Sequence, residues 1–262
     1  GLEGILLFGA LAGALGAQAS GSALVGLLTG MGVGALIGLV FGTISTSLRG
    51  SQLISGVGIN LLALGFVALM LSVMGAPGFH SVAREVQVPL IPLGVGNLSP
   101  LVPITVAVAI GVWWLLRRTQ LGIWIRAVGE NPAAADVAGI RVNRVRLGAA
   151  VAAGVLAGLA GAYLSIDWFG AVTKEITAGR GFIALAIVVF SGLNPLLALL
   201  GGFIFGFFDG LATWVATYPG IKDIIPWQFV AMMPYVVTLA VVAGMIGRVR
   251  FPSALGVPYL RE

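Results

Sequence analysis

The sequence predicts an all-α membrane protein, a polytopic bundle of transmembrane helices. Only 14 basic and 9 acidic residues occur among 262, so 9% are charged, where a soluble domain carries about 25%. Hydrophobic residues make up 59%, and the mean hydropathy is +1.08. So few polar side chains cannot cover a surface in water, which excludes a soluble enzyme and a disordered tail. The absence of cysteine excludes a disulfide-stabilised scaffold.

Eight apolar stretches are candidates for the membrane spans, each of which needs about 20 residues. The first and sixth are short, and the second is long enough that we expect it to be tilted or broken. Between the sixth and the seventh, Gly192-Leu193-Asn194-Pro195 is a turn signal that indicates a bent pair or a half-helix. The eight stretches cover residues 4–19, 22–47, 53–74, 101–116, 147–168, 181–193, 196–216 and 229–247.

Two connections between these stretches are long. Loop 76–99 contains several prolines and the single histidine, His80, which suits a structured external loop or a short surface helix rather than a separate domain. For His80 a packing or solvated role is favoured over a ligand role. We expect a single transmembrane domain over residues 1–262, with loop 117–146 on the side of the membrane opposite to loop 76–99. Because the chain opens on Gly1 within an apolar stretch, we expect N-terminal sequence to be missing.

The distribution of basic residues predicts the orientation. Six of the 14 lie in loop 117–146 and three in the tail after residue 247, which places both segments on the cytoplasmic side. Alternation of the spans adds Arg49 to that side and leaves four basic residues outside. This bias is typical of a multi-pass membrane protein embedded in lipid. A contiguous basic face, which nucleic-acid binding requires, is not indicated.

Glycine recurs every four residues in the second stretch and at the same spacing elsewhere. Such a stripe leaves one side of a helix bare and lets two backbones approach closely, which drives helix association in lipid. The spacing fits a static tight contact or one that slides during transport. The stripes comprise Gly26, Gly30, Gly34, Gly38 and Gly42, with Gly9 and Gly13, Gly154 and Gly158, and Gly202, Gly206 and Gly210.

Loop 117–146 carries the clearest local signal in the chain. Asn131 is a good N-cap, Pro132 suits the first helical position, and Gly139 can end a helix of about seven residues. A helix this short is unstable alone in water, so it must pack on its own protein or on a partner. Such a capped helix in a basic loop is suited to being gripped by a cytosolic partner. The alternative is an ordinary amphipathic connector.

Several motifs resemble those of one transporter family. Arg126-Ala-Val-Gly-Glu-Asn-Pro-Ala-Ala-Ala135 followed by Ala138-Gly139-Ile140 resembles the coupling loop of ABC importer permeases for branched-chain amino acids, simple sugars and nucleosides. Gly179-Arg-Gly-Phe-Ile-Ala-Leu-Ala186, Ser191-Gly-Leu-Asn-Pro-Leu196 and Gly201-Gly-Phe-Ile-Phe-Gly206 continue the resemblance across the chain, and Gly1-Leu-Glu-Gly4 looks like the end of an early motif. Gly50-Ser-Gln-Leu-Ile-Ser-Gly56 with Asn60, and Ala254-Leu-Gly-Val-Pro-Tyr259, look most like the nucleoside branch.

The resemblance implies a pore-forming subunit without enzymatic activity of its own. It implies two cytoplasmic ATPase subunits that bind ATP and Mg²⁺, a second permease that is identical or homologous, and an extracytoplasmic substrate-binding protein. No Gly-x-x-x-x-Gly-Lys-Ser/Thr occurs in the sequence, so a P-loop for ATP is absent from it, and no cofactor is expected in this chain. By the same resemblance, the residues that couple to the ATPase are Arg126, Gly129, Glu130, Asn131, Pro132, Ala135, Asp136, Gly139 and Arg141.

Polar side chains inside the apolar stretches are candidates for the translocation path, because they are costly in lipid. Asp209 lies in the middle of stretch 196–216, and Gln52, Ser55 and Asn60 bring hydrogen-bonding groups to one segment. Asn and Gln amides can bond the edges of a nucleobase or the hydroxyls of a sugar. The alternative for each is a hydrogen bond that holds two helices together. Glu3 would also lie in the membrane if sequence precedes it.

Other functions remain as alternatives. A permease for branched-chain amino acids shares most of these motifs, and an ATP-independent secondary transporter or channel is the main alternative of another class. Such a transporter would show a charged ion relay or an inverted repeat, and neither is evident. No His-Glu-x-x-His occurs, so an intramembrane metalloenzyme and a metal site are not expected.

Overall fold

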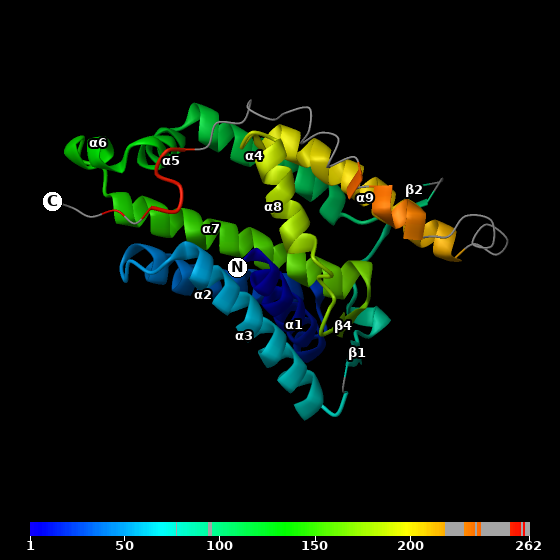
Figure 1. Cartoon of the computed structure of the whole chain (residues 1–262). Helices are drawn as coiled ribbons and strands as arrows, with labels where there is room; N and C mark the ends of the chain where they lie inside the picture. Colours follow the sequence, from blue (N-terminus) through cyan, green and yellow to red (C-terminus); the bar gives the residue numbers. More distant parts are fainter. Residues whose placement is uncertain are drawn as a thin grey trace. The chain divides into compact units, whose positions relative to one another are not determined.

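The computed structural model describes residues 1–76, 78–93, 96–217, 228–233, 235–236, 252–257 and 259. Figure 1 shows the helices and strands of the chain, which divides into two compact units. The first comprises residues 1–105, 116–182 and 252–262, and the second comprises residues 106–115 and 183–251. Helices dominate both, and six described helices are long and apolar enough to cross a membrane, as an all-α polytopic protein requires.

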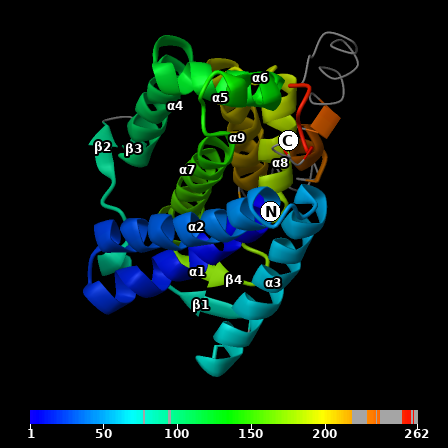
Figure 2. The same cartoon turned by 90° about the vertical axis from the view of Figure 1, so that its left-hand side faces the viewer.

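Four long helices build the first unit. They are α1 (Leu2–Ser20), α2 (Ala23–Thr46), α3 (Gln52–Val73) and α7 (Val142–Tyr163), and α7 continues as a π-helical turn over Leu164–Trp168. Helix α1 is central: 61% of its apolar window is buried, against 22% for α2 and for α3. Figure 2 shows α1 and α2 side by side, with α3 leading away from them.

Three of these helices confirm the predicted stretches to within two residues. Helix α2 is continuous over its 24 residues, so the prediction that this stretch is tilted or broken is wrong as regards a break. Helix α7 begins at Val142, five residues before the predicted start of the fifth stretch. The earlier start places part of the basic loop on the first turn of a core helix.

The glycine stripe of α2 forms the tightest helix contact of the first unit. A Cβ atom built on Gly34 would lie 2.7 Å from Cα of Gly158, and one on Gly38 would lie 2.7 Å from the carbonyl oxygen of Ala150. On the other side of α7, a Cβ on Gly9 of α1 would lie 2.7 Å from Cα of Gly158. Real Cβ atoms do not approach so closely, so these positions require glycine. The predicted close packing is confirmed for the stripes of α1, α2 and α7, whereas among the described residues nothing lies within 4 Å of a Cβ built on Gly202, Gly206 or Gly210.

The two segments expected outside meet in a small sheet. Strand β1 (Phe79–Ser81) of loop 76–99 pairs antiparallel with β4 (Ala171–Thr173), with His80 opposite Val172. The His80 Nε2 lies 2.7 Å from Gln18 Oε1, at the end of α1, so His80 has the packing role favoured by the sequence. A short 3₁₀ turn (Arg84–Val86) follows, and β2 (Ile91–Leu93) pairs with β3 (Gly96–Leu98). The predicted structured loop is confirmed.

The remaining helices follow the chain from α4 onward. Helix α4 (Leu101–Arg118) leads to α5 (Gln120–Glu130) and α6 (Pro132–Val137). Helix α8 (Arg180–Phe190) starts in the first unit, which includes residues up to 182, and α9 (Pro195–Thr217) lies in the second. The predicted turn joins them, and Leu196 N donates there to Asn194 Oδ1 at 3.1 Å. At 11 residues α8 is too short to span a membrane, which fits the predicted half-helix. The predicted eighth stretch, 229–247, lies mostly outside the described residues.

Candidate functional site

The short helix α6 has the caps that the sequence predicts. Asn131 adopts extended backbone angles, and its Oδ1 accepts a hydrogen bond of 3.0 Å from Ala134 N. Pro132 occupies the first helical position, where a missing N–H costs nothing. The helix spans six residues, one fewer than predicted. Since Asn131 also ends α5, the two helices meet at a single non-helical residue.

The other end of α6 closes in a Schellman motif. Gly139 has a φ of +84°, its N–H donates to the Asp136 carbonyl at 2.9 Å, and Ile140 N donates to the Ala135 carbonyl at 3.0 Å. Only glycine adopts this left-handed geometry without strain. Ile140 then turns inward and joins the apolar cluster beneath the helix. Both ends of α6 are therefore closed by local hydrogen bonds.

An apolar cluster holds α6 against its neighbours. Val128 of α5, Ala135 of α6 and Val142 of α7 are buried together, and Tyr259 near the C-terminus packs against them. The opposite face of α6 is open to solvent, and Val137 is 92% exposed at its end. An apolar side chain this exposed on a capped helix is suited to insertion into a partner. The sequence analysis did not single out Val137, although it is the last apolar side chain before Gly139.

The C-terminal segment also contacts α5 and α6, and no feature of the sequence predicts this contact. We call residues 252–257 and 259 the C-terminal strap. Ala254 N donates to the Gly129 carbonyl at 3.1 Å, and the Ser253 hydroxyl donates to the Glu130 carbonyl. Arg146 Nη1 of α7 donates to the Val257 carbonyl at 2.8 Å, and the Tyr259 hydroxyl donates to Asp136 Oδ2 at 3.0 Å. The strap thus contacts α5, α6 and α7.

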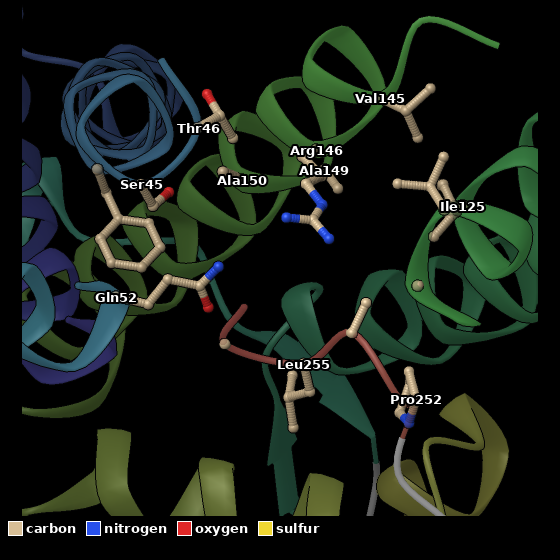
Figure 3. Close-up of a pocket in the computed structure, with 15 residues that line it drawn as sticks. Ser45, Thr46, Gln52, Ile125, Val145, Arg146, Ala149, Ala150, Pro252 and Leu255 are labelled. Carbon is tan, nitrogen blue, oxygen red and sulfur yellow. The ribbon is translucent and has the colours of Figure 1, made fainter. Parts of the chain in front are cut away.

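A pocket of about 280 Å³ lies between the strap and the helix ends (Figure 3). The Arg146 guanidinium and the Gln52 amide extend into it, and Leu255 and Pro252 of the strap close one side. Gln52, predicted for the translocation path, therefore lies near the segments that surround α6. The pocket is lined by one end each of α2 and α3, by the first turns of α7 and by the last turn of α5.

A second, more polar pocket of about 320 Å³ adjoins α6. Arg49, Arg141 and Arg144 line it together with Asp136 and Tyr259. These basic residues come from the turn between α2 and α3 and from the start of α7, so segments that the charge bias places on one side do meet. The nine residues predicted to couple to the ATPase lie on α5, on α6, at the caps of these helices and of α7, or in the short connection between α6 and α7. They are Arg126, Gly129, Glu130, Asn131, Pro132, Ala135, Asp136, Gly139 and Arg141.

The other residues predicted for the path are Ser55, Asn60 and Asp209. The Asn60 Oδ1 accepts a 2.8 Å hydrogen bond from Gly4 N of α1, which is the helix-joining role given as the alternative. The Ser55 hydroxyl donates to the Ser51 carbonyl of its own helix turn at 2.9 Å. Asp209 lies on α9 in the second unit, apart in sequence and unit from the other three.

Glu3 is a polar residue of α1 whose partners only the structure reveals. Its carboxylate accepts hydrogen bonds from Gly179 N at 2.9 Å and from Gly181 N at 2.7 Å, at the start of α8. The N-terminus of a helix offers unpaired N–H groups and a positive dipole end, so a carboxylate is favourable there. Gly179 has a φ of +79°, which turns both N–H groups toward Glu3. The sequence offers a signal only in retrospect, in the two glycines that flank Arg180.

Replacing Glu3 by alanine is expected to destabilise the start of α8. It leaves the N–H groups of half-buried Gly179 and buried Gly181 without this acceptor, and a buried N–H group without a partner costs about 1–3 kcal/mol. The midpoint of thermal unfolding in detergent should fall by several degrees. The exposed Glu175→Ala, which removes the same carboxylate from a nearby loop, is the control and should leave it unchanged. An unchanged midpoint in Glu3→Ala would show that these bonds contribute nothing.

Comparison with known proteins decides the family. Residues 1–246 match the family described as branched-chain amino acid transport system / permease component. The chain belongs to this permease family. The permease is 33% identical to the nucleoside ABC transporter permease protein NupC of Lactococcus lactis and 34% identical to the guanosine ABC transporter permease protein NupQ of Bacillus subtilis. Each alignment covers all of this chain and 87% of the relative.

A third relative carries a different substrate name. The permease is 31% identical to the putative glucose ABC transporter permease protein TsgC13 of Haloferax volcanii, over all of this chain and 88% of that protein. No solved structure matches the permease. Membership of the family makes the chain a multi-pass membrane subunit of an ABC transporter in the plasma membrane. Such permeases work with ATPase subunits and a substrate-binding protein.

Proposed function

We propose that the permease imports nucleosides into the cytoplasm, driven by ATP hydrolysis in partner subunits. The observation that carries this proposal is that two relatives named for nucleoside and guanosine transport align with the whole chain. A sugar is the second candidate, because a putative glucose permease also aligns with the whole chain. A branched-chain amino acid has less support, since the permease named for it aligns over only 53% of this chain.

The proposed assembly contains further subunits. Two ATPase subunits would bind ATP and Mg²⁺, a second permease, identical or homologous, would complete the pore, and an extracytoplasmic binding protein would deliver the substrate. The lack of a P-loop motif in this sequence supports the need for ATPase partners. Exposed apolar side chains on α2 and α3 suit contact with lipid or with the second permease.

The proposed docking element for the ATPase is α6. It is capped at both ends, fixed on its inner face by Ala135, and open on its outer face. Val137 would insert between side chains of the ATPase, and the nearby Arg126 and Arg141 would meet acidic groups there. Motion of the ATPase would then pass through α6 to α7, because Val142 of α7 packs in the same cluster.

The proposed translocation path involves weak polar contacts. Gln52 supports this most directly, because its amide extends into the pocket between α3 and α7. Ser55, Asn60 and Asp209 remain proposals of the same kind. The hydrogen bond from Gly4 to Asn60 uses one lone pair of the Asn60 amide oxygen and leaves the amide its two donors.

Replacing Val137 by glutamate is expected to weaken ATPase docking. A charge at the exposed end of α6 cannot be buried in an apolar socket without a large desolvation cost. The fraction of ATPase that copurifies with the permease in mild detergent should fall about tenfold or more, for a loss of at least 1.4 kcal/mol. The control is Leu90→Glu, which places the same charge at a half-exposed apolar position of loop 76–99. If the ATPase copurified normally with Val137→Glu, Val137 would not be part of the interface with the ATPase.

The substrate class is tested by competition in cells. Cells that lack endogenous nucleoside uptake would express the complete transporter and receive radiolabelled guanosine. Unlabelled nucleosides should abolish the accumulation, and excess glucose or leucine should leave it unchanged. Accumulation of labelled glucose or leucine without nucleoside competition would assign the permease to another substrate class.

A further inference from the structure

We propose that the C-terminal strap is part of the coupling device, with Tyr259 as the positioning residue that holds α6 in place for the ATPase. This inference rests on the proposed function and extends it to a segment that no coupling motif includes. The observation behind it is that a segment more than 110 residues away from α6 in sequence makes four hydrogen bonds with α6 and its neighbours α5 and α7.

Helix α6 needs support beyond its own caps. Its six residues form fewer than two turns, and such a helix is unstable without packing. It joins α5 through Asn131 alone, so rotation about the backbone of that residue would swing α6 as a unit. A helix that receives force from a partner must resist this rotation, otherwise the force moves α6 and nothing else.

The strap stabilises the α5 side of this joint. The last carbonyl groups of a helix lack intrahelical partners. Two of those in α5, at Gly129 and Glu130, accept hydrogen bonds from Ala254 N and from the Ser253 hydroxyl. A Cβ built on Gly129 would lie 3.5 Å from Cβ of Pro252, so the strap runs close beside this end of α5. The end of α5 is therefore fixed against the strap.

The strap also connects α6 to the core of the first unit. The Tyr259 hydroxyl donates to Asp136 in the last turn of α6, while its ring packs beside Val128 and Val142. Two residues earlier, the Val257 carbonyl accepts from Arg146, on the first turns of α7. A displacement of Asp136 is thus carried through the strap to α7, the helix that packs on the glycine stripe of α2.

Tyr259→Phe tests this role with minimal change, because it removes the hydroxyl and keeps the ring. The experiment uses the complete transporter in proteoliposomes and measures ATP hydrolysed per molecule of guanosine imported. One hydrogen bond changes an equilibrium constant by about fivefold. We therefore expect the ratio of ATP hydrolysed to guanosine imported to rise about fivefold. Basal ATP hydrolysis and the subunit composition should stay unchanged. Tyr235→Phe, at a half-exposed position in the second unit, is the matched control and should leave the ratio unchanged.

A double-mutant cycle separates a specific pair from general damage. Asp136→Ala should raise the ratio as Tyr259→Phe does, and the double variant should be no worse than the single ones. Multiplied effects, or a wild-type ratio in Tyr259→Phe, would overturn the proposal. Hydrogen exchange of the amides of residues 132–139 in the assembled transporter should be faster in Tyr259→Phe. If the wild type imports no nucleoside, the proposed function fails. Independently of import, equal hydrogen-exchange rates of residues 132–139 in the wild type and in Tyr259→Phe would overturn the strap proposal.

Discussion

Replacing Gly158 by valine is expected to prevent the permease from accumulating as a folded protein. Gly158 lies where three helices meet: its own Cβ would stand 2.9 Å from Cα of Gly34 in α2, and Gly9 of α1 approaches it from another side. A branched side chain would push α7 away from both helices. Because packing rather than the hydrophobic effect holds helices together in lipid, the separated helices regain nothing elsewhere. The amount of monodisperse permease recovered in detergent should fall at least tenfold.

The same helix provides a control. Gly148→Val introduces an equal side chain on α7, at a position where a Cβ would meet nothing within 4 Å. Its yield and elution profile should match those of the wild type. Normal recovery of Gly158→Val would mean that the three helices are not packed as closely as the structure shows.

Replacing Asn131 and Pro132 together by glycine is expected to uncouple ATP hydrolysis from import. The change removes the side-chain cap of α6 and the fixed φ of the proline at its first position. The two glycines also raise the conformational entropy of the unfolded segment, which makes its folding into a helix less favourable. Helix α6 would lose order while the membrane helices stay folded. ATP hydrolysis should continue at or near its basal rate, and guanosine uptake by proteoliposomes should fall below a tenth of the wild-type rate.

The conservative change Asn131→Asp separates the cap from other effects. A carboxylate is as good an acceptor at this position and lies at the positive end of the helix dipole. Uptake in this variant should remain close to that of the wild type. Full uptake in the double glycine variant, with normal assembly, would show that an ordered α6 is not needed for coupling.

Features set by neighbouring residues were predictable from the sequence. The cap at Asn131, the end of α6 at Gly139 and the stripe from Gly26 to Gly42 each follow from spacing within one helix. Their physical causes are local: a side-chain acceptor, a left-handed residue and a bare face. The same holds for the turn at Asn194 between α8 and α9.

Features that join distant segments were not predictable from one sequence. Glu3 bonds residues 176 and 178 positions away, and Tyr259 bonds a residue 123 positions away. Nothing near Glu3 indicates which helix start receives its carboxylate, and nothing near Tyr259 indicates Asp136. The pairing of β1 with β4 has the same origin, since three-residue strands carry too little alternation to stand out. Such partners emerge only when the helices are placed.

Helix spacing alone also left the role of Asn60 open. The sequence placed it on a polar segment near Gln52, which suited a path for nucleosides. In the structure Asn60 points to the backbone of α1, whereas Gln52 extends into a pocket. The two residues are eight positions apart, so they lie on different turns and meet different neighbours.

The most direct test of the proposed import mechanism is guanosine uptake by proteoliposomes that contain the permease, its ATPase subunits and its binding protein. Uptake is expected to require hydrolysable ATP on the side of the membrane that α6 faces, and to stop when ATP is replaced by a non-hydrolysable analogue. Unlabelled nucleosides should compete, while glucose and leucine should not. Guanosine uptake that proceeds equally without ATP would contradict an ATP-driven importer and indicate a channel or a secondary transporter.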